Sequence, residues 1–198
     1  MQDSGFFNSI DGDRLYSADD FSHFYGLFFT DGVVSLPEES LKCTAGEGLS
    51  VNIAAGEALI KSHYFRHSEE STVELETAHD TYPRIDLIVV KYDNTDTGRK
   101  ITLEAKTGVP AQPPQPPALE RNDDVYELAI AVAGIAAGAT TISSFRDTRS
   151  EENYCGLVKS KFAVDGVPQP DTGTVPYGTI VPAISGNFIT PAGAYTEA

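Results

Sequence analysis

The chain has 198 residues and a formal charge of −15, since 14 lysines and arginines stand against 29 aspartates and glutamates. Binding to nucleic-acid backbones or anionic membranes needs clustered basic residues, so the composition argues against both partners. No apolar run approaches the roughly 20 residues of a membrane-spanning helix. The first residues show no signal-peptide pattern, and two cysteines are too few for a disulfide scaffold. We expect a soluble, acidic globular protein made in the cytoplasm, with one domain or one domain plus an appendage.

An aromatic helix is predicted near the N-terminus. Four aromatic residues follow the i, i+3, i+4, i+7 spacing of one helix face, namely Phe21, Phe24, Tyr25 and Phe28. Ser17 is the candidate N-cap, with Asp20 as a capping-box partner, and Gly32 is the candidate end of the helix. A stripe of this kind most often packs into the core of its own domain. The alternative is that it packs against a neighbouring subunit.

From Val33 to about Arg149 the pattern predicts short β-strands. Predicted strands cover 49–53, 58–65, 72–77, 85–92, 100–106 and 125–132. The β-branched residues 140–142 predict that the chain returns in a further strand. The run 85–92 is continuously apolar, which is typical of a strand buried on both faces. Turn-forming residues at 93–98 join it to 100–106 as a hairpin. This series predicts a mainly β fold, an antiparallel β-sandwich-like module or a barrel.

The composition divides the chain into three parts: an N-terminal segment at 1–32 with the aromatic helix, a β-sandwich module at 33–158, and a C-terminal arm at 159–198. After Phe162 there is no Lys, Arg or His, and residues 163–198 hold five prolines and five glycines. Such a segment is too rich in Pro and Gly for its own core and too apolar for a free linker. We expect an extended arm that is ordered on a partner, with a disordered tail as the alternative.

No motif predicts catalysis or metal binding. His63 and His67 have a spacing found in metal sites, but the predicted strand does not support it. The sequence has no HExxH, CxxC or GxSxG motif and no phosphate-binding loop. Adjacent carboxylates are frequent, as in the solvated surface of an acidic chain. We therefore expect no enzyme, no cofactor and no metal.

Charged residues within the strand region suggest structural ion pairs. Arg84 and Asp86 lie at the start of the most apolar strand, and Arg146, Asp147 and Arg149 close the strand region. A buried charge is costly unless it is paired. We expect these residues to pair with one another and to fix the strand ends.

A series of short motifs runs along residues 5–158. It comprises YSADDF at 16–21, Gly32-Val33, AGEALI at 55–60, Tyr64, PRIDLIVV at 83–90, KTGVP at 106–110, PPALER at 116–121, DVYELA at 124–129, Ile142, DTR at 147–149 and Cys155-Gly156. In this order it resembles the N-terminal module of tail and baseplate structural proteins in phages of Gram-positive bacteria. The resemblance implies a multimeric docking unit, built from strands with an N-terminal helical element, that attaches a fibre or receptor-binding part to the tail tip.

The expected function is therefore that of a virion structural protein of a phage tail or baseplate. Its expected partners are further copies of itself, with a trimer as one option, and other tail or baseplate proteins. No large carbohydrate-recognition domain follows the module in this sequence, so an adaptor role is expected rather than receptor binding. The arm could add a strand to the exposed edge of a neighbour. Expected contact residues are Phe6, Phe7, Phe21, Phe24, Tyr25 and Phe28 at the front, and Tyr177, Ile180, Val181, Phe188 and Ile189 in the arm.

Two other functions are weighed against this one. A carbohydrate-binding module contacting the host surface would stack sugar rings on Tyr64, Tyr82, Tyr92 or Tyr126, although the absence of Trp counts against it. A glycan-cleaving enzyme is the third interpretation, and no motif supports it.

Overall fold

The computed structural model describes residues 5–162. The chain divides into two units, Met1–Ser160 and Lys161–Ala198. The predicted arm beyond Phe162, with its five contact residues from Tyr177 to Ile189, lies outside the described residues. The described part is mainly β: it has a single α-helix and ten strands, and every strand pair is antiparallel, as predicted.

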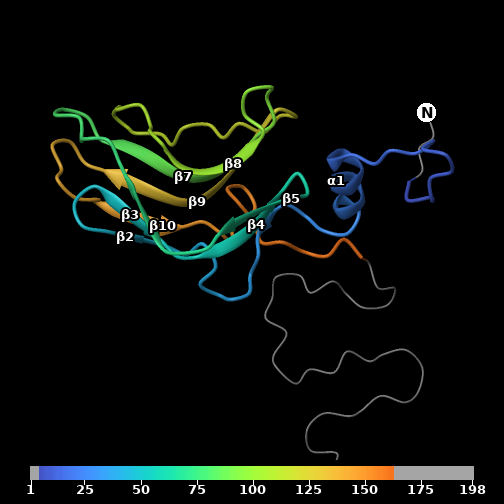
Figure 1. Ribbon diagram of the computed structural model, residues 1–198. Helices are drawn as coiled ribbons and strands as arrows, with labels where there is room; N and C mark the ends of the chain where they lie inside the picture. Colours follow the sequence, from blue (N-terminus) through green and yellow to red (C-terminus); the bar gives the residue numbers. More distant parts are fainter. Residues whose placement is uncertain (1–4, 163–198) are drawn as a thin grey trace, which may run out of the picture. The chain divides into compact units, whose positions relative to one another are not determined.

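The strands form three sheets (Figure 1). A four-stranded sheet has the order β10-β9-β7-β8, with β7 at Arg84–Asp93, β8 at Lys100–Lys106, β9 at Val125–Ile135 and β10 at Ser144–Asp147. A second sheet has the order β1-β4-β5, with β1 at Gly32–Val33, β4 at Gly56–Ile60 and β5 at His63–His67. The third has the order β2-β3-β6, with β2 at Cys43–Ala45, β3 at Ser50–Ile53 and β6 at Ser71–Glu74.

Strand β7 is the centre of the described fold. It pairs with β8, so the predicted hairpin over residues 85–106 is confirmed, and on its other side it pairs along its whole length with β9. Ile88 and Val90 belong to the main core, whereas Leu87 and Val89 pack in a smaller cluster on the opposite face. The strand is therefore covered on both faces, as its continuous apolar run predicted.

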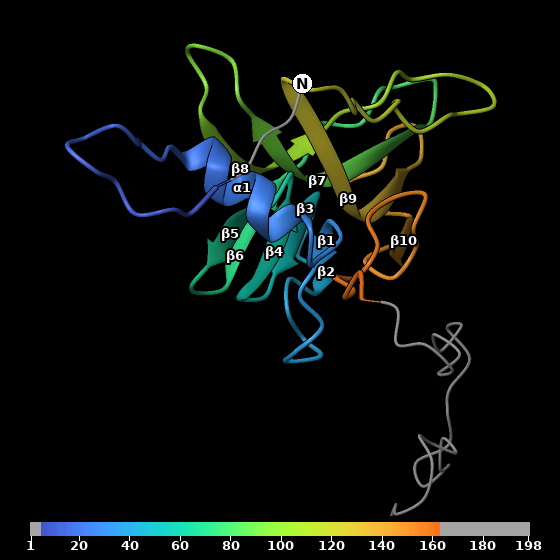
Figure 2. The same ribbon diagram turned by 90° about the vertical axis from the view of Figure 1, so that its right-hand side faces the viewer.

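The main hydrophobic core takes residues from all three sheets. Figures 1 and 2 show β7, β8 and β9 as one layer, with strands of the two smaller sheets facing it, and Figure 1 shows β10 next to β2 and β3. The fully buried side chains of this core include Val33, Leu41, Val51, Ile53, Ile60, Ile88, Val90, Leu128, Ile130 and Ile135. Packing between the layers thus supplies most of the apolar burial that stabilises the module.

Two strand predictions were wrong in detail. The run 58–65 is a hairpin of β4 and β5, because Lys61 and Ser62 turn the chain with φ angles of 49° and 62°. Positive φ at both positions is the geometry of the tight turns that join antiparallel strands, and the Lys61 amide donates to Asp31 Oδ1 at 2.8 Å. The strand after β9 is β10 rather than residues 140–142, which lie in the loop before it.

Helix α1 spans Ala18–Gly26. Ser17 precedes it, and its amide and hydroxyl both donate to Asp20 Oδ2, at 2.6 and 3.0 Å. The helix ends six residues before the predicted end at Gly32, with Leu27 as its C-cap. The residues that follow pair elsewhere: the Thr30 amide donates to the Lys159 carbonyl, and the Val33 amide donates to the Gly156 carbonyl. These long-range hydrogen bonds compete with further helical turns.

Candidate interaction site

Aromatic side chains gather around α1. We call the eight rings of residues 5–29 the aromatic cluster: Phe6, Phe7, Tyr16, Phe21, Phe24, Tyr25, Phe28 and Phe29. Phe24 is its centre, since its ring lies 4.9 Å from that of Phe6 and 4.8 Å from that of Phe28, both in edge-to-face contact. Phe21 and Tyr25 contact the same group. The guanidinium of Arg14 lies 5.3 Å from the Phe7 ring.

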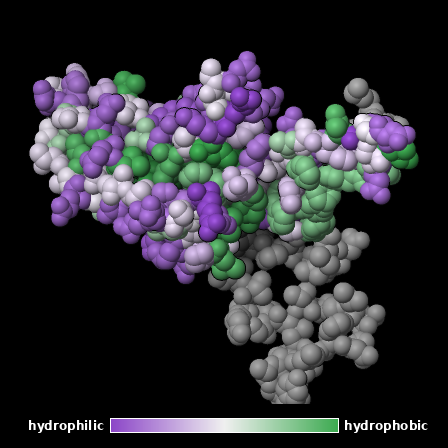
Figure 3. All heavy atoms as spheres, in the orientation of Figure 1, coloured by the Kyte–Doolittle hydropathy of each residue, from purple (hydrophilic) through white to green (hydrophobic). Residues whose placement is uncertain are grey.

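The aromatic cluster is not part of the core. No residue of α1 is buried, and the exposed fractions of Phe21, Phe24 and Tyr25 are 49%, 38% and 51%. The interpretation of the stripe as core is therefore wrong within the described residues: the rings pack mainly on one another. Figure 3 shows apolar side chains over α1 on the face in view. Contiguous apolar surface of this kind marks interaction sites in proteins.

One contact joins α1 directly to the β-strands. Ser22 Oγ lies 3.3 Å from Nε2 of His63 on β5, and Nδ1 of His63 lies 2.8 Å from the Lys61 carbonyl oxygen. The His63 ring also packs against the Tyr92 ring, with their centroids 5.0 Å apart. Because a carbonyl can only accept, Nδ1 carries a proton. The hairpin turn at Lys61 thus orients the histidine toward the helix.

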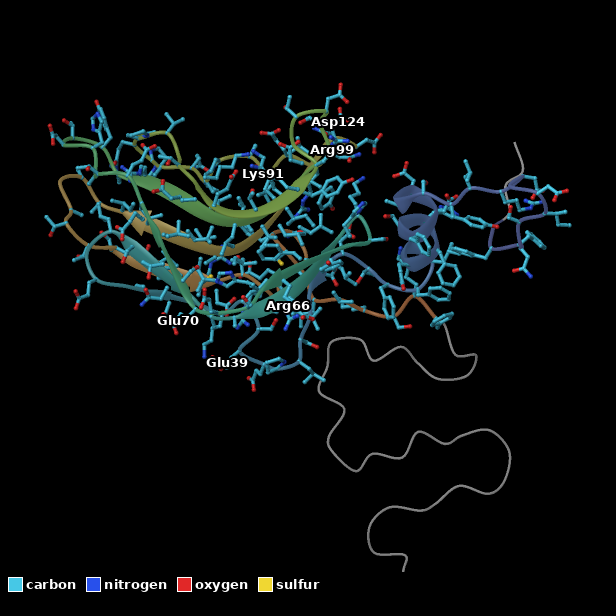
Figure 4. All side chains as sticks on the ribbon, in the orientation of Figure 1. Glu39, Arg66, Glu70, Lys91, Arg99 and Asp124 are labelled. Atoms are coloured by element: carbon cyan, nitrogen blue, oxygen red, sulfur yellow. The ribbon has the colours of Figure 1, made fainter. Side chains whose placement is uncertain are left out.

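A groove lies beside this contact, with a volume of about 1260 Å³. We call it the aromatic groove. Its apolar lining comes from α1 and the residues after it, from β4 and β5, and from the β7–β8 hairpin: Phe21, Tyr25, Phe29, Leu59, Tyr64, Phe65, Tyr92 and Ile101. Its charged lining residues are Asp19, Arg66, Asp93, Arg99 and Lys100. In Figure 4, the labelled Arg66 comes from β5 and the labelled Arg99 from the end of the β7–β8 hairpin.

The predicted pair at the start of β7 is buried. Nε of Arg84 donates to both carboxylate oxygens of Asp86 at 3.0 Å. The same guanidinium donates to the carbonyls of Glu76 and Thr77, which precede the strand. Asp86 also accepts the amide of Gly108 at 2.8 Å. All these partners belong to the fold, so the pair connects three segments and has a structural role.

The charged group at the end of β10 divides into two pairs. Arg149 Nη2 lies 2.7 Å from Asp147 Oδ2, and Nη1 donates to the carbonyls of Glu38 and Ser40. Burial acts to raise the pKa of Asp147, but the hydrogen bonds and charge of Arg149 outweigh it and the pKa is lowered. Arg146 pairs instead with Glu151, and its guanidinium lies 5.0 Å from the Tyr154 ring.

Glu127 is a buried acid that the sequence analysis did not single out. Its Oε2 accepts from Lys106 Nζ at 2.7 Å and from the Glu120 amide at 2.7 Å. Gly108 has a similar structural role, because a Cβ there would lie 2.0 Å from the Ile85 carbonyl oxygen. Both residues belong to the series of short motifs along residues 5–158, Gly108 to KTGVP and Glu127 to DVYELA. Those motifs therefore carry hydrogen bonds and close backbone contacts of the fold.

The two cysteines are free, buried thiols. Burial raises the pKa of Cys43 and of Cys155 from 9.0 to about 12. Because the thiolate is the reactive form of cysteine, this environment suits packing rather than nucleophilic chemistry.

The four tyrosines considered for sugar stacking do not form one platform. Tyr64 and Tyr92 both line the aromatic groove, but Tyr64 is 80% exposed and Tyr92 only 7%. Tyr126 is covered by cations, with Lys61 Nζ 5.3 Å and Arg121 Cζ 5.6 Å from its ring centroid. Tyr82 packs against His79. Of these rings, Tyr64 alone offers a largely free face.

Within residues 5–162, no three His, Cys, Asp or Glu side chains are grouped so as to hold a metal ion. In the same range, no helix combines the length and apolar character needed to cross a bilayer.

No family model matches the chain, and no curated protein matches its sequence significantly.

Proposed function

We propose that this chain is a non-enzymatic structural protein of a phage tail or baseplate that forms a homo-oligomer and docks a fibre or receptor-binding component to the tail. The observation that carries the proposal is the aromatic cluster on a helix with no buried residue. An aromatic side chain buries roughly 150–250 Å² when it is covered. A few such rings would supply a large share of a standard interface, which has about 800 Å² per partner.

The wider architecture follows from the same proposal. The layers that share the main core would form a β-sandwich-like module. The arm was predicted to begin at 159, but Lys159 is hydrogen-bonded to Thr30 of the module, so residues 161–198 would act as the arm that contacts neighbouring subunits. The order of motifs along residues 5–158, which resembles tail and baseplate docking modules, supports placing this assembly in a virion. A trimer is the arrangement we would test first, because closed rings arise when one contact is repeated around an axis.

The measurement that tests the proposal is the molar mass of the full-length protein by light scattering over a wide range of concentrations. We expect an oligomer, and we expect the variant Phe21→Ser/Phe24→Ser/Tyr25→Ser to be monomeric. Tyr82→Ser is the matched control, because Tyr82 is similarly exposed at 47% but lies outside the aromatic cluster. A monomeric wild-type protein at high concentration would refute the proposal. Antibody labelling of purified phage particles then tests the location in the tail.

A further inference from the structure

The aromatic groove reaches the free edge of β5. Five successive residues, 62–66, line it. Successive side chains of a strand point to opposite faces, so a groove that touches all five reaches the edge of the strand; Leu59 of β4, opposite Tyr64, shows that it also extends over one face of the hairpin. β5 is the last strand in the order β1-β4-β5. Its outer backbone groups therefore have no strand partner in the described part of the chain, and they can accept an added strand.

Unpaired positive charge lies at the same groove. Arg99 and Lys100 both line it. Apart from Lys161, every other lysine and arginine side chain in residues 5–162 has a hydrogen bond or an ion pair, whereas these two have neither. Asp93 lies opposite Lys100 in the β7–β8 hairpin and its pKa is lowered, mainly by hydrogen bonds from Thr95 and in part by the Lys100 charge, but neither cation forms an ion pair or a hydrogen bond with it. In a chain with a net charge of −15, two adjacent cations in this state are an unusual feature. With Arg66, which pairs with Glu57, they outnumber Asp19 and Asp93, the two acidic residues of the lining, and this balance favours an acidic ligand.

The sequence of this chain contains a segment with the matching chemistry. Residues 163–198 hold three acidic residues, Asp165, Asp171 and Glu197, and no basic ones. Within them, Tyr177–Val181 is a run of five residues between Pro176 and Pro182. Its last three residues are β-branched, which favours strand formation. The flanking prolines cannot donate to a ladder and would limit the added strand to this run.

We propose that Tyr177–Val181 of a second copy of the chain adds to the edge of β5 in the aromatic groove, with the acidic residues of the same segment attracted to Arg99 and Lys100. Backbone hydrogen bonds supply the affinity, and the aromatic lining receives the apolar side chains. This inference rests on the proposed function, since it names the surface through which the arm joins neighbouring subunits.

The test is zero-length carbodiimide cross-linking of the full-length protein, which joins a lysine amine to a carboxylate in contact with it. Unlabelled and ¹⁵N-labelled chains are mixed, cross-linked and analysed by mass spectrometry. We expect cross-links between Lys100 of one isotope and Asp165, Asp171 or Glu197 of the other. Cross-links from Lys100 only to carboxylates within residues 1–162, or only within chains of one isotope, would overturn the inference.

Paired variants test the strand and the charge separately. Thr179→Pro removes a backbone donor from the run, and we expect the yield of mixed cross-links to fall by roughly fivefold or more, as for the loss of one hydrogen bond. Thr174→Pro, outside the run, should leave the yield unchanged. Arg99→Glu should reduce the yield, whereas Lys42→Glu, with the same change in charge elsewhere, should not. An equal response within either pair would contradict the inference.

Light scattering on the same samples separates the two proposals. If the protein is monomeric, the proposed function fails and the inference fails with it. If it is oligomeric but Lys100 gives no mixed cross-link to residues 163–198, the docking of the arm in the aromatic groove fails alone.

Discussion

Arg84 and Asp86, two residues apart on β7, form an ion pair in the interior of the protein, with exposed fractions of 3% and 0%. Alternation along the strand puts both side chains on one face. From there the pair reaches the carbonyls before β7 and the Gly108 amide after β8. It therefore ties the ends of the central hairpin to the segment that enters it.

Replacing one partner of this pair should be far more damaging than replacing a partner of an exposed pair. We expect Asp86→Ala to lower the free energy of unfolding by about 3–5 kcal/mol, because it leaves the Arg84 charge buried without a partner. Glu39→Ala breaks the exposed pair with Lys42 and should cost at most about 1 kcal/mol. Urea denaturation of both variants provides the measurement. Similar losses in the two variants would contradict the structural role of the buried pair.

Gly108 should not tolerate a side chain. In Gly108→Ala, the new Cβ would lie 2.0 Å from the Ile85 carbonyl oxygen, so the hairpin must shift and the Asp86 hydrogen bond must lengthen. We expect a loss of more than about 3 kcal/mol in thermal or urea unfolding. Gly138→Ala is the control: its Cβ meets open space, and the φ of 65° alone should cost roughly 1–2 kcal/mol. The prediction fails if Gly108→Ala is the milder change.

The buried thiols should make the protein sensitive to alkali. Their pKa values are raised from 9.0 to about 12, so above pH 9 the unfolded chain releases protons that the folded protein retains. The stabilisation that comes from keeping the buried thiols protonated is fully present below about pH 9 and is lost as the pH rises toward 12. By about pH 10.5 we expect the free energy of unfolding to have fallen by about 2 kcal/mol per thiol.

The double variant Cys43→Ala/Cys155→Ala should remove this pH dependence. Its stability can be lower throughout, but it should fall less steeply than that of the wild type between about pH 8 and 10.5. The measurement is urea unfolding at each pH. An identical slope in both proteins would show that the thiols are not protected by burial.

The aromatic cluster should matter little for the stability of the folded monomer. We expect Phe24→Ser, compared at concentrations where the wild type is dissociated, to lower the free energy of unfolding by no more than about 1 kcal/mol, as is usual for surface positions. Leu128→Ala, in the main core, should cost about 2–5 kcal/mol. If Phe24→Ser were as damaging as Leu128→Ala, the ring would belong to the core and the interface proposal would lose its support.

The β7–β8 hairpin and the capped start of α1 could be predicted because their signals are local. The apolar run at 85–92 and the turn residues at 93–98 identify a hairpin without knowledge of the rest of the chain. Ser17 and Asp20 identify a helix start in the same way. The end of α1 could not be predicted, since it depends on hydrogen bonds to Gly156 and Lys159, more than 100 residues away. The turn at Lys61 and Ser62 was missed because neither residue is typical of a tight turn.

By itself, the sequence determined a mainly β, antiparallel chain with an aromatic N-terminal helix, because hydrophobic periodicity and capping are properties of neighbouring residues. The tertiary structure alone decided that the aromatic rings lie outside the core. It also decided that Arg99 and Lys100 have no hydrogen-bond or ion-pair partner within residues 5–162 and that a groove reaches the β5 edge. Burial, pairing and cavity shape depend on which distant segments pack together, and local patterns do not carry that information.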